Sequence, residues 1–267
     1  MDSLDRWQAS SHPELAKCKP EELFLPPQAE LYKQLHADLG DRFIQINGTI
    51  LTLEKLSDFP FDYLYGPNDM EFWRLVVQNF FEIVIIKLHG LVNDTGQNVH
   101  SIKLFKNQIM KWTWHDPQKH ALFKQTLQER KFDQQTRSTA KRIREIRNNR
   151  LAHRLLDSQN GLPKQLLTGL SLGDLRQLFY AAHTLFGAIS FGSTYCTLAG
   201  DLIPGTIGGQ PKRSCLDKVL DAVLRDSDLV KQPELRTAYW NFERQYLPPE
   251  EIEIMNRMRQ RIGLPEA

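Results

Sequence analysis

The sequence predicts an all-α fold, and three features of the chain support this prediction. Apolar residues recur at intervals of three and four through the long segments, as they do on the buried face of a helix. Three of these segments follow a capping box, in which Ser or Asn precedes an acidic residue by three positions. Strand patterns are weak outside residues 43–53. We therefore expect a four-helix bundle with helical additions at both ends.

The first predicted helix begins near Pro26-Pro27, after a polar N-terminal segment. Residues 1–25 are expected to form a loosely ordered arm. Proline is favourable at a helix start, because the N–H that it lacks would have no partner there. Residues 43–53 fit a helix face, but they also fit a hairpin that turns at Asn47-Gly48. The helical patterns on both sides favour the helix.

The most apolar predicted helix covers residues 69–93, after a capping box of Asn68 and Glu71, and we expect it to be central. Later helices are expected at 101–112, 118–130 and 134–156, then after capping boxes at Ser171 and Ser214, and after the prolines at 248–249. The expected organisation is an arm over 1–25, a helical bundle over 26–199, and a linker with a helical extension over 200–267.

Composition argues against several classes of protein. The three cysteines, Cys18, Cys196 and Cys215, are widely spaced and odd in number, which argues against a disulfide scaffold and fits a reducing cytoplasm. No Cys-x-x-Cys pair is present to hold a structural zinc ion. The glycines of residues 200–211 lack the Gly-Lys-Ser/Thr sequence of a phosphate-binding P-loop. We expect neither a metal ion nor another cofactor.

The uncharged stretch of 24 residues from Gln177 to Gly200 has the length of a membrane span. Polar residues, among them His183, Ser190 and Thr194, are spread through it, so we expect a buried core helix instead. The first residues lack the basic and apolar regions of a secretory signal. We therefore expect a cytoplasmic protein without a membrane segment.

Positive charge is concentrated in one segment of the chain. Residues 130–154 contain nine basic and two acidic residues, a net charge of +7, while the rest of the chain carries −5. A concentrated positive field attracts anionic partners, and a polyphosphate is the obvious one. A solvated helix face would show the same composition, so the charge alone does not assign a function.

A more specific pattern lies within this segment, in the sequence IREIRNNRLAHRL of residues 143–155. On a helix with 100° per residue, Arg147, Arg150 and Arg154 share one face. His153 lies at the margin of that face. Guanidinium groups stay charged and bind phosphate oxygens, whereas a histidine titrates near neutrality and can move a proton. The set suits cleavage of RNA by its own 2′-hydroxyl group, a reaction that needs no metal.

The sequence RNNRLAH of residues 147–153 resembles the signature of the HEPN superfamily (higher eukaryote and prokaryote nucleotide-binding domains), which is an Arg, a polar residue and a His after four to six positions. The form IRNNRLAHR is similar to that of the abortive-infection-associated branch. The sequence LSLGDLRQLFYAAHTLF of residues 170–186 resembles the last core helix of the same branch. The likeness covers residues 28–195 and implies a HEPN-like four-helix bundle.

The resemblance also implies a site and partners. Arg147, Asn148 and His153 match the motif and would form a metal-independent ribonuclease site, which in this family is commonly shared by two protomers. Asn148 could orient the histidine or contact a ribose. The implied partners are RNA or a nucleotide, a second copy of the chain, and an antitoxin or defence-system protein. The implied role is that of a toxin or a phage-defence protein.

Three further arginines of the segment are candidate phosphate ligands: Arg144, Arg150 and Arg154. Two other classes of function remain open. One is a non-catalytic HEPN scaffold that binds a nucleotide or a protein through the same basic face. The other is a helical interaction protein in which the basic helix has no special role. Loss of His153 abolishes catalysis but leaves phosphate binding intact if the arginines remain, so the classes differ in a measurable way.

Overall fold

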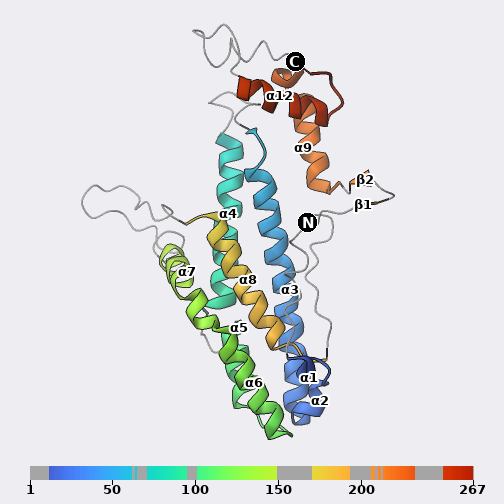
Figure 1. Cartoon of the computed structure of the whole chain (residues 1–267). Coiled ribbons are helices and arrows are strands. Elements are labelled where there is room, and N and C mark those ends of the chain that lie inside the picture. Colours follow the sequence, from blue (N-terminus) through green and yellow to red (C-terminus); the bar gives the residue numbers. More distant parts are fainter. Residues whose placement is uncertain are drawn as a thin grey trace, which may run out of the picture. The chain divides into compact units, whose positions relative to one another are not determined.

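The computed structural model describes residues 12–61, 64, 71–94, 101–148, 170–192, 206–207, 210–211, 213–231 and 249–266. These residues are mostly helical, which confirms the predicted all-α class (Figure 1). The chain forms two compact units, the first made of residues 1–50 and 82–198 and the second of residues 51–81 and 199–267. The sequence analysis placed 51–81 in the bundle. In the structure this segment groups with the C-terminal helices because it shares their apolar core.

The elements follow one another along the chain as α1 (Pro13–Ala16), α2 (Pro20–Leu23), α3 (Pro26–Ser57), α4 (Glu71–Val92), α5 (Ile102–Lys111), α6 (Pro117–Arg130), α7 (Phe132–Ile146), α8 (Leu172–Ala188), β1 (Thr206–Ile207), β2 (Gln210–Pro211), α9 (Cys215–Asp226), α10 (Asp228–Lys231) and α12 (Pro249–Arg261). The strands β1 and β2 form one antiparallel pair within the predicted linker. The capping boxes predicted at Ser171 and Ser214 are both present, at the starts of α8 and α9.

The ambiguous segment 43–53 is helical throughout, as the flanking patterns predicted, and forms part of α3. Phe43, Ile46, Ile50 and Leu53 are each at most 2% exposed. Their spacing of three, four and three residues places all four side chains on one face of a helix, whereas a strand would have divided them between two faces.

The expectation of a loose N-terminal arm is wrong for residues 12–25, which form α1 and α2. Leu15, Leu23 and Phe24 are completely buried. The Leu23 carbonyl accepts the His115 N–H at 2.9 Å. Gly192 adopts φ +64° against this segment, and a Cβ there would stand 2.9 Å from the carbonyl oxygen of Cys18. Few apolar residues mark this segment in the sequence, but nearly all of them are buried by neighbours from distant parts of the chain.

The first unit is built around α8, which also contacts α5, α6 and α7. The ring of Phe186 packs against Phe43 of α3, with 4.9 Å between the ring centroids. Tyr32 of α3 donates its hydroxyl to the Ile189 carbonyl at 2.8 Å and accepts the Phe191 N–H at 2.7 Å. These bonds fix the carboxyl end of α8 against α3. The described part of the uncharged stretch is therefore the core helix that the sequence analysis expected.

The helix α4 is, in the part of the chain that the structure describes, the one helix with the length and composition of a membrane span, with a mean hydropathy of 1.6. One third of its apolar window is buried inside the protein. Phe72, Leu75, Ile83 and Ile86 are exposed apolar residues of this helix. The core helix of a soluble protein can have the same length and composition, so the finding does not assign α4 to a membrane.

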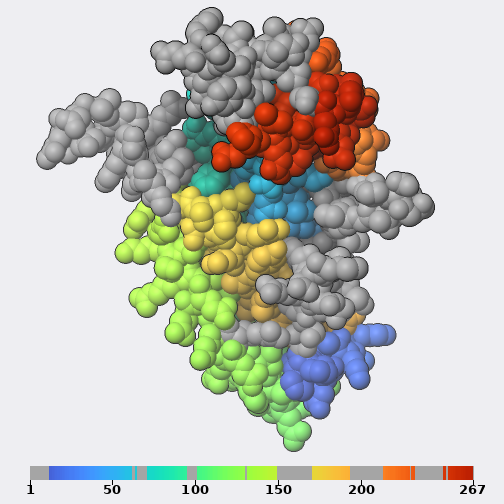
Figure 2. Space-filling view, turned by 45° about the horizontal axis from the view of Figure 1, so that its top comes forward, coloured from blue at the N-terminus to red at the C-terminus, as the bar shows by residue number. Residues whose placement is uncertain are grey.

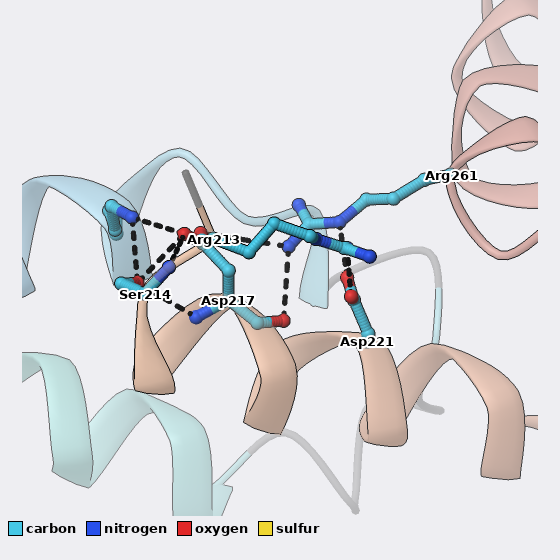
Figure 3. Close-up of polar contacts among 6 residues, drawn as sticks. Arg213, Ser214, Asp217, Asp221 and Arg261 are labelled. Atoms are coloured by element: carbon cyan, nitrogen blue, oxygen red, sulfur yellow. Dashed lines mark hydrogen bonds and ion pairs between the residues drawn. The ribbon is translucent and has the colours of Figure 1, made fainter. Parts of the chain in front are cut away.

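The second unit has its own apolar core and a polar network beside it. Leu56, Phe61, Leu220 and Met255 are among the buried residues of the core. In the network, Asp221 is 7% exposed in its side chain and pairs with Arg213 and with Arg261, whose Nε lies 2.6 Å from a carboxylate oxygen (Figure 3).

Asp217 is the second acid of this network. It accepts from Lys55 at 2.7 Å and from the backbone and hydroxyl of Ser214, at 2.8 and 2.7 Å. Burial by itself raises the pKa of the Asp217 carboxyl. The bonds from Lys55 and Ser214 outweigh burial and lower this pKa from 3.8 to about 2. The network therefore stabilises the ionised form of Asp217 in the folded protein.

Asp217 gives the second unit an acid-sensitive stability. Because the pKa of Asp217 is lower in the folded than in the unfolded chain, its contribution is complete above about pH 5 and is lost as the pH falls toward 2. Over this range we expect the free energy of unfolding of the unchanged protein to fall by about 1–2 kcal/mol more than that of Asp217→Asn. Denaturant titrations at several pH values measure the difference.

The matched control is Glu253→Gln, which removes a carboxylate that is 74% exposed in the same unit. It should leave the pH profile unchanged. Equal acid sensitivity in the unchanged protein and in Asp217→Asn would contradict the role assigned to this carboxylate.

Candidate nucleic-acid interface

The basic helix α7 has one apolar face and one charged face. Phe132, Thr136, Ile143 and Ile146 are buried, and the helix packs beside α8 (Figure 2). Phe132 and Ile146 are 6% and 3% exposed. The spacing of these residues, mostly three or four, makes them a single stripe, so the residues between them must face outward.

A groove of 620 Å³ lies along the outward face of α7. Its cationic lining residues are Lys103 of α5 and Arg137, Lys141 and Arg144 of α7, against the single acid Asp133. The three α7 cations are four and three residues apart, so they project from the same side of the helix. Within the described lining, the groove carries an excess of three positive charges.

The end of α4 holds the far end of this groove. Asn93, just after α4, donates from Nδ2 to the Ala140 carbonyl at 2.9 Å and accepts from Nη2 of Arg144 at 3.5 Å. Both residues line the groove. The carboxyl end of a helix carries a partial negative charge, which favours a cation beside it. Asn93 thus connects the α7 backbone with the side chain of Arg144 and orients that arginine.

His89 lies four residues before Asn93, in the last turn of α4, and is 8% exposed. Burial lowers the pKa of its imidazole, and the charges of Arg147 and Arg144 lower it further, while Asp94 acts in the opposite direction. The result is a histidine that is neutral at pH 7 within the electrostatic range of two motif-region arginines. The sequence analysis gave His89 a structural role only.

Arg42 of α3 adds a further cation near the same turn. Its Nη2 would be 3.1 Å from a Cβ at Gly90, and a carboxylate oxygen of Asp94 would be 3.7 Å from that Cβ. A side chain at position 90 would therefore push against the guanidinium of Arg42. The absence of a side chain at Gly90 lets a cation from α3 approach the end of α4.

The structure describes three of the six residues that the sequence analysis proposed for the site. Arg144 lines the groove. Arg147 is exposed and donates from Nη1 to Oδ1 of Asn148 at 3.0 Å. Asn148 therefore contacts the motif arginine, a pairing that the sequence analysis did not consider. Arg150, His153 and Arg154 lie outside the described residues.

The helix containing the motif departs from the ideal geometry assumed in the sequence analysis. α7 ends at Ile146, and residues 147–148 continue in a wider, π-helical turn. At 100° per residue Arg147 would point within 40° of Ile143, yet Ile143 is completely buried and Arg147 is exposed. The wider turn changes the angular register, so positions beyond 146 cannot be placed on the ideal helix.

Several residues of the groove were missed by sequence reasoning. The spacing of Arg137, Lys141 and Arg144 is visible in the sequence and could have identified the outward face. Lys103 and Asn93 come from other helices, and no sequence pattern connects them with α7. Within the described ranges, no group of three or more His, Cys, Asp or Glu residues is close enough to hold a metal ion.

Comparison of the chain with protein-family models, with curated proteins and with solved structures finds no match. The candidate site is therefore argued from its own residues.

Proposed function

We propose that this protein binds RNA along the basic groove of α7 and cleaves it without a metal ion at the motif that begins at Arg147. The observation that carries the proposal is the groove itself. Four cations from two helices line it against one acid, and Arg144 is oriented at the end nearest the motif. A site of this charge and length suits a chain of phosphates better than a single small anion.

The geometry supports backbone contacts more than base recognition. Arginine offers paired donors to phosphate oxygens, and lysine offers a mobile point charge. Arg137, Lys141 and Arg144 span seven residues of helix, a rise of about 10 Å. This length allows contact with successive phosphates of one strand. Such contacts position the strand but do not read its sequence.

The proposed cleavage step uses the ribose 2′-hydroxyl as nucleophile. Its oxygen forms a bond to phosphorus while the bond to the 5′-oxygen of the next nucleotide breaks. His153 takes part in the proton transfer that this exchange requires, and Arg147 offsets the charge that develops on the phosphate oxygens. The products are a 2′,3′-cyclic phosphate and a free 5′-hydroxyl. The neutral imidazole of His89 lies in the same region as a second group able to accept a proton.

The likeness of residues 147–153 to the HEPN motif supports the same proposal. It extends it to a HEPN-like bundle, a homodimer, and a toxin or phage-defence role in the cytoplasm. A non-catalytic HEPN scaffold is the alternative, and it differs in predicting RNA binding without cleavage.

Removing groove cations should weaken RNA binding and reduce its salt dependence. For Arg137→Gln/Lys141→Gln we expect the Kd for a single-stranded RNA to rise about tenfold, and the slope of log K against log salt to decrease by about 1. Fluorescence anisotropy at several salt concentrations measures both quantities.

The control is Arg142→Gln, which removes a charge from the same helix. Arg142 lies 3.9 Å from Asp174 of α8 and does not line the groove. It should bind RNA like the unchanged protein. An equal loss in Arg142→Gln would show that net charge, and not the groove, determines binding.

Cleavage should depend on the motif and not on a metal ion. In EDTA, we expect the unchanged protein to cut a pool of cellular RNA, and His153→Ala to lose at least 100-fold in rate, as is typical when a proton-transfer group is removed. Arg147→Ala should also lose activity. Helix content by circular dichroism and mass in solution are compared first. RNA that is bound but not cut by the unchanged protein would favour the scaffold, and cutting by His153→Ala would contradict the proposed site.

A further inference from the structure

A second pocket, of 580 Å³, lies where α5, α6 and α7 meet, with Leu185 of α8 also in its lining. It shares Phe132, Asp133 and Gln134 with the groove, so the two hollows are neighbours at the start of α7. Its volume falls within the range of about 300–1,000 Å³ that is typical of small-molecule sites. The proposed RNA site does not use this pocket.

The lining of the pocket is both cationic and apolar. Four lysines line it, from the end of α5, from α6 and from the α6–α7 junction: Lys106, Lys111, Lys124 and Lys131. The one acid in the lining is Asp133, which is 64% exposed and lies 3.4 Å from Lys106. The pocket therefore keeps an excess of three positive charges. Its apolar lining residues are Met110, Leu127, Phe132 and Leu185.

The junction between α6 and α7 adds to this arrangement. Lys131 adopts φ +44°, and it is the one non-glycine residue with positive φ among the described residues. Such a conformation costs about 1 kcal/mol or more. The same residue precedes the first turn of α7, and no side chain caps that turn. Since the first three residues of α7 line the pocket, the positive end of the helix dipole adds to the charge of the lysines.

We propose that this pocket binds a nucleotide, with the phosphate among the lysines and the base or ribose against the apolar lining residues. Four cations with one partly neutralised acid demand an anionic ligand, and the apolar lining demands that the ligand also have a flat or apolar part. A nucleoside phosphate meets both requirements. The nucleotide can be part of an RNA strand that continues from the groove, in which case the inference rests on the proposed function, or it can be a free mononucleotide.

Two variants test the pocket without disturbing the backbone. Lys124→Gln removes a charge from α6. Lys131→Asn removes a charge but keeps a residue type that tolerates positive φ, so the helix junction should be preserved. The control is Lys119→Gln, which makes the same change on α6 outside the pocket lining. Circular dichroism and melting temperature establish that all three variants fold.

Binding is measured by calorimetry with AMP and by anisotropy with a single-stranded RNA of twelve nucleotides. We expect Lys124→Gln and Lys131→Asn to raise the Kd for at least one of these probes by fivefold or more, while Lys119→Gln does not. A change for AMP identifies a free-nucleotide site. A change for RNA alone identifies a subsite of the bound strand.

The outcomes also separate this inference from the proposed function. AMP binding that requires Lys124, in a protein that binds no RNA, would support the pocket and remove the RNA proposal. RNA binding that depends on Arg137 and Lys141 but is unchanged in Lys124→Gln and Lys131→Asn, together with no effect of these two variants on AMP, overturns the pocket and leaves the groove.

Discussion

The packing of one face of α7 against α8 determines where the positive charge of this protein lies. Fully burying a side chain such as Phe132 or Ile143 contributes about 1.5–3 kcal/mol each. Burying an unpaired lysine or arginine would cost several kcal/mol. These two magnitudes act in the same direction, so they fix the rotation of the helix about its axis. Arg137, Lys141 and Arg144 then face outward together.

The same rotation has an electrostatic consequence. Cations that share one helix face repel one another, and Asp133 is the single acid in the groove lining. Two unit charges about 8 Å apart in water interact by only about 0.5 kcal/mol, so the fold tolerates this repulsion. A polyanion that enters the groove removes it and releases its own counterions. In the second unit the acids Asp217 and Asp221 are instead paired with three cations of that unit. The contrast is why the groove, and not that network, is the candidate site.

Much of the fold is predictable from the sequence because it is set by local spacing and local caps. Phe43, Ile46 and Ile50 identify a helix by their intervals, and Ser171 and Ser214 identify helix starts by the acids three residues later. The burial of residues 12–25 was not predictable, because their partners come from distant segments. The site divides in the same way. The outward cations of α7 are visible as a pattern, whereas Lys103, Asn93 and His89 belong to other helices and become neighbours only through the tertiary fold.

The central claim is that RNA lies against this face of α7, and lysine-acetylation footprinting tests it most directly. The protein is acetylated with and without a single-stranded RNA, and each lysine is quantified by mass spectrometry. The account predicts that Lys103 and Lys141 are protected by RNA, whereas Lys33 and Lys231, which are 45% and 46% exposed, react as before. Protection of all four lysines to the same degree, or of Lys33 and Lys231 alone, would contradict it.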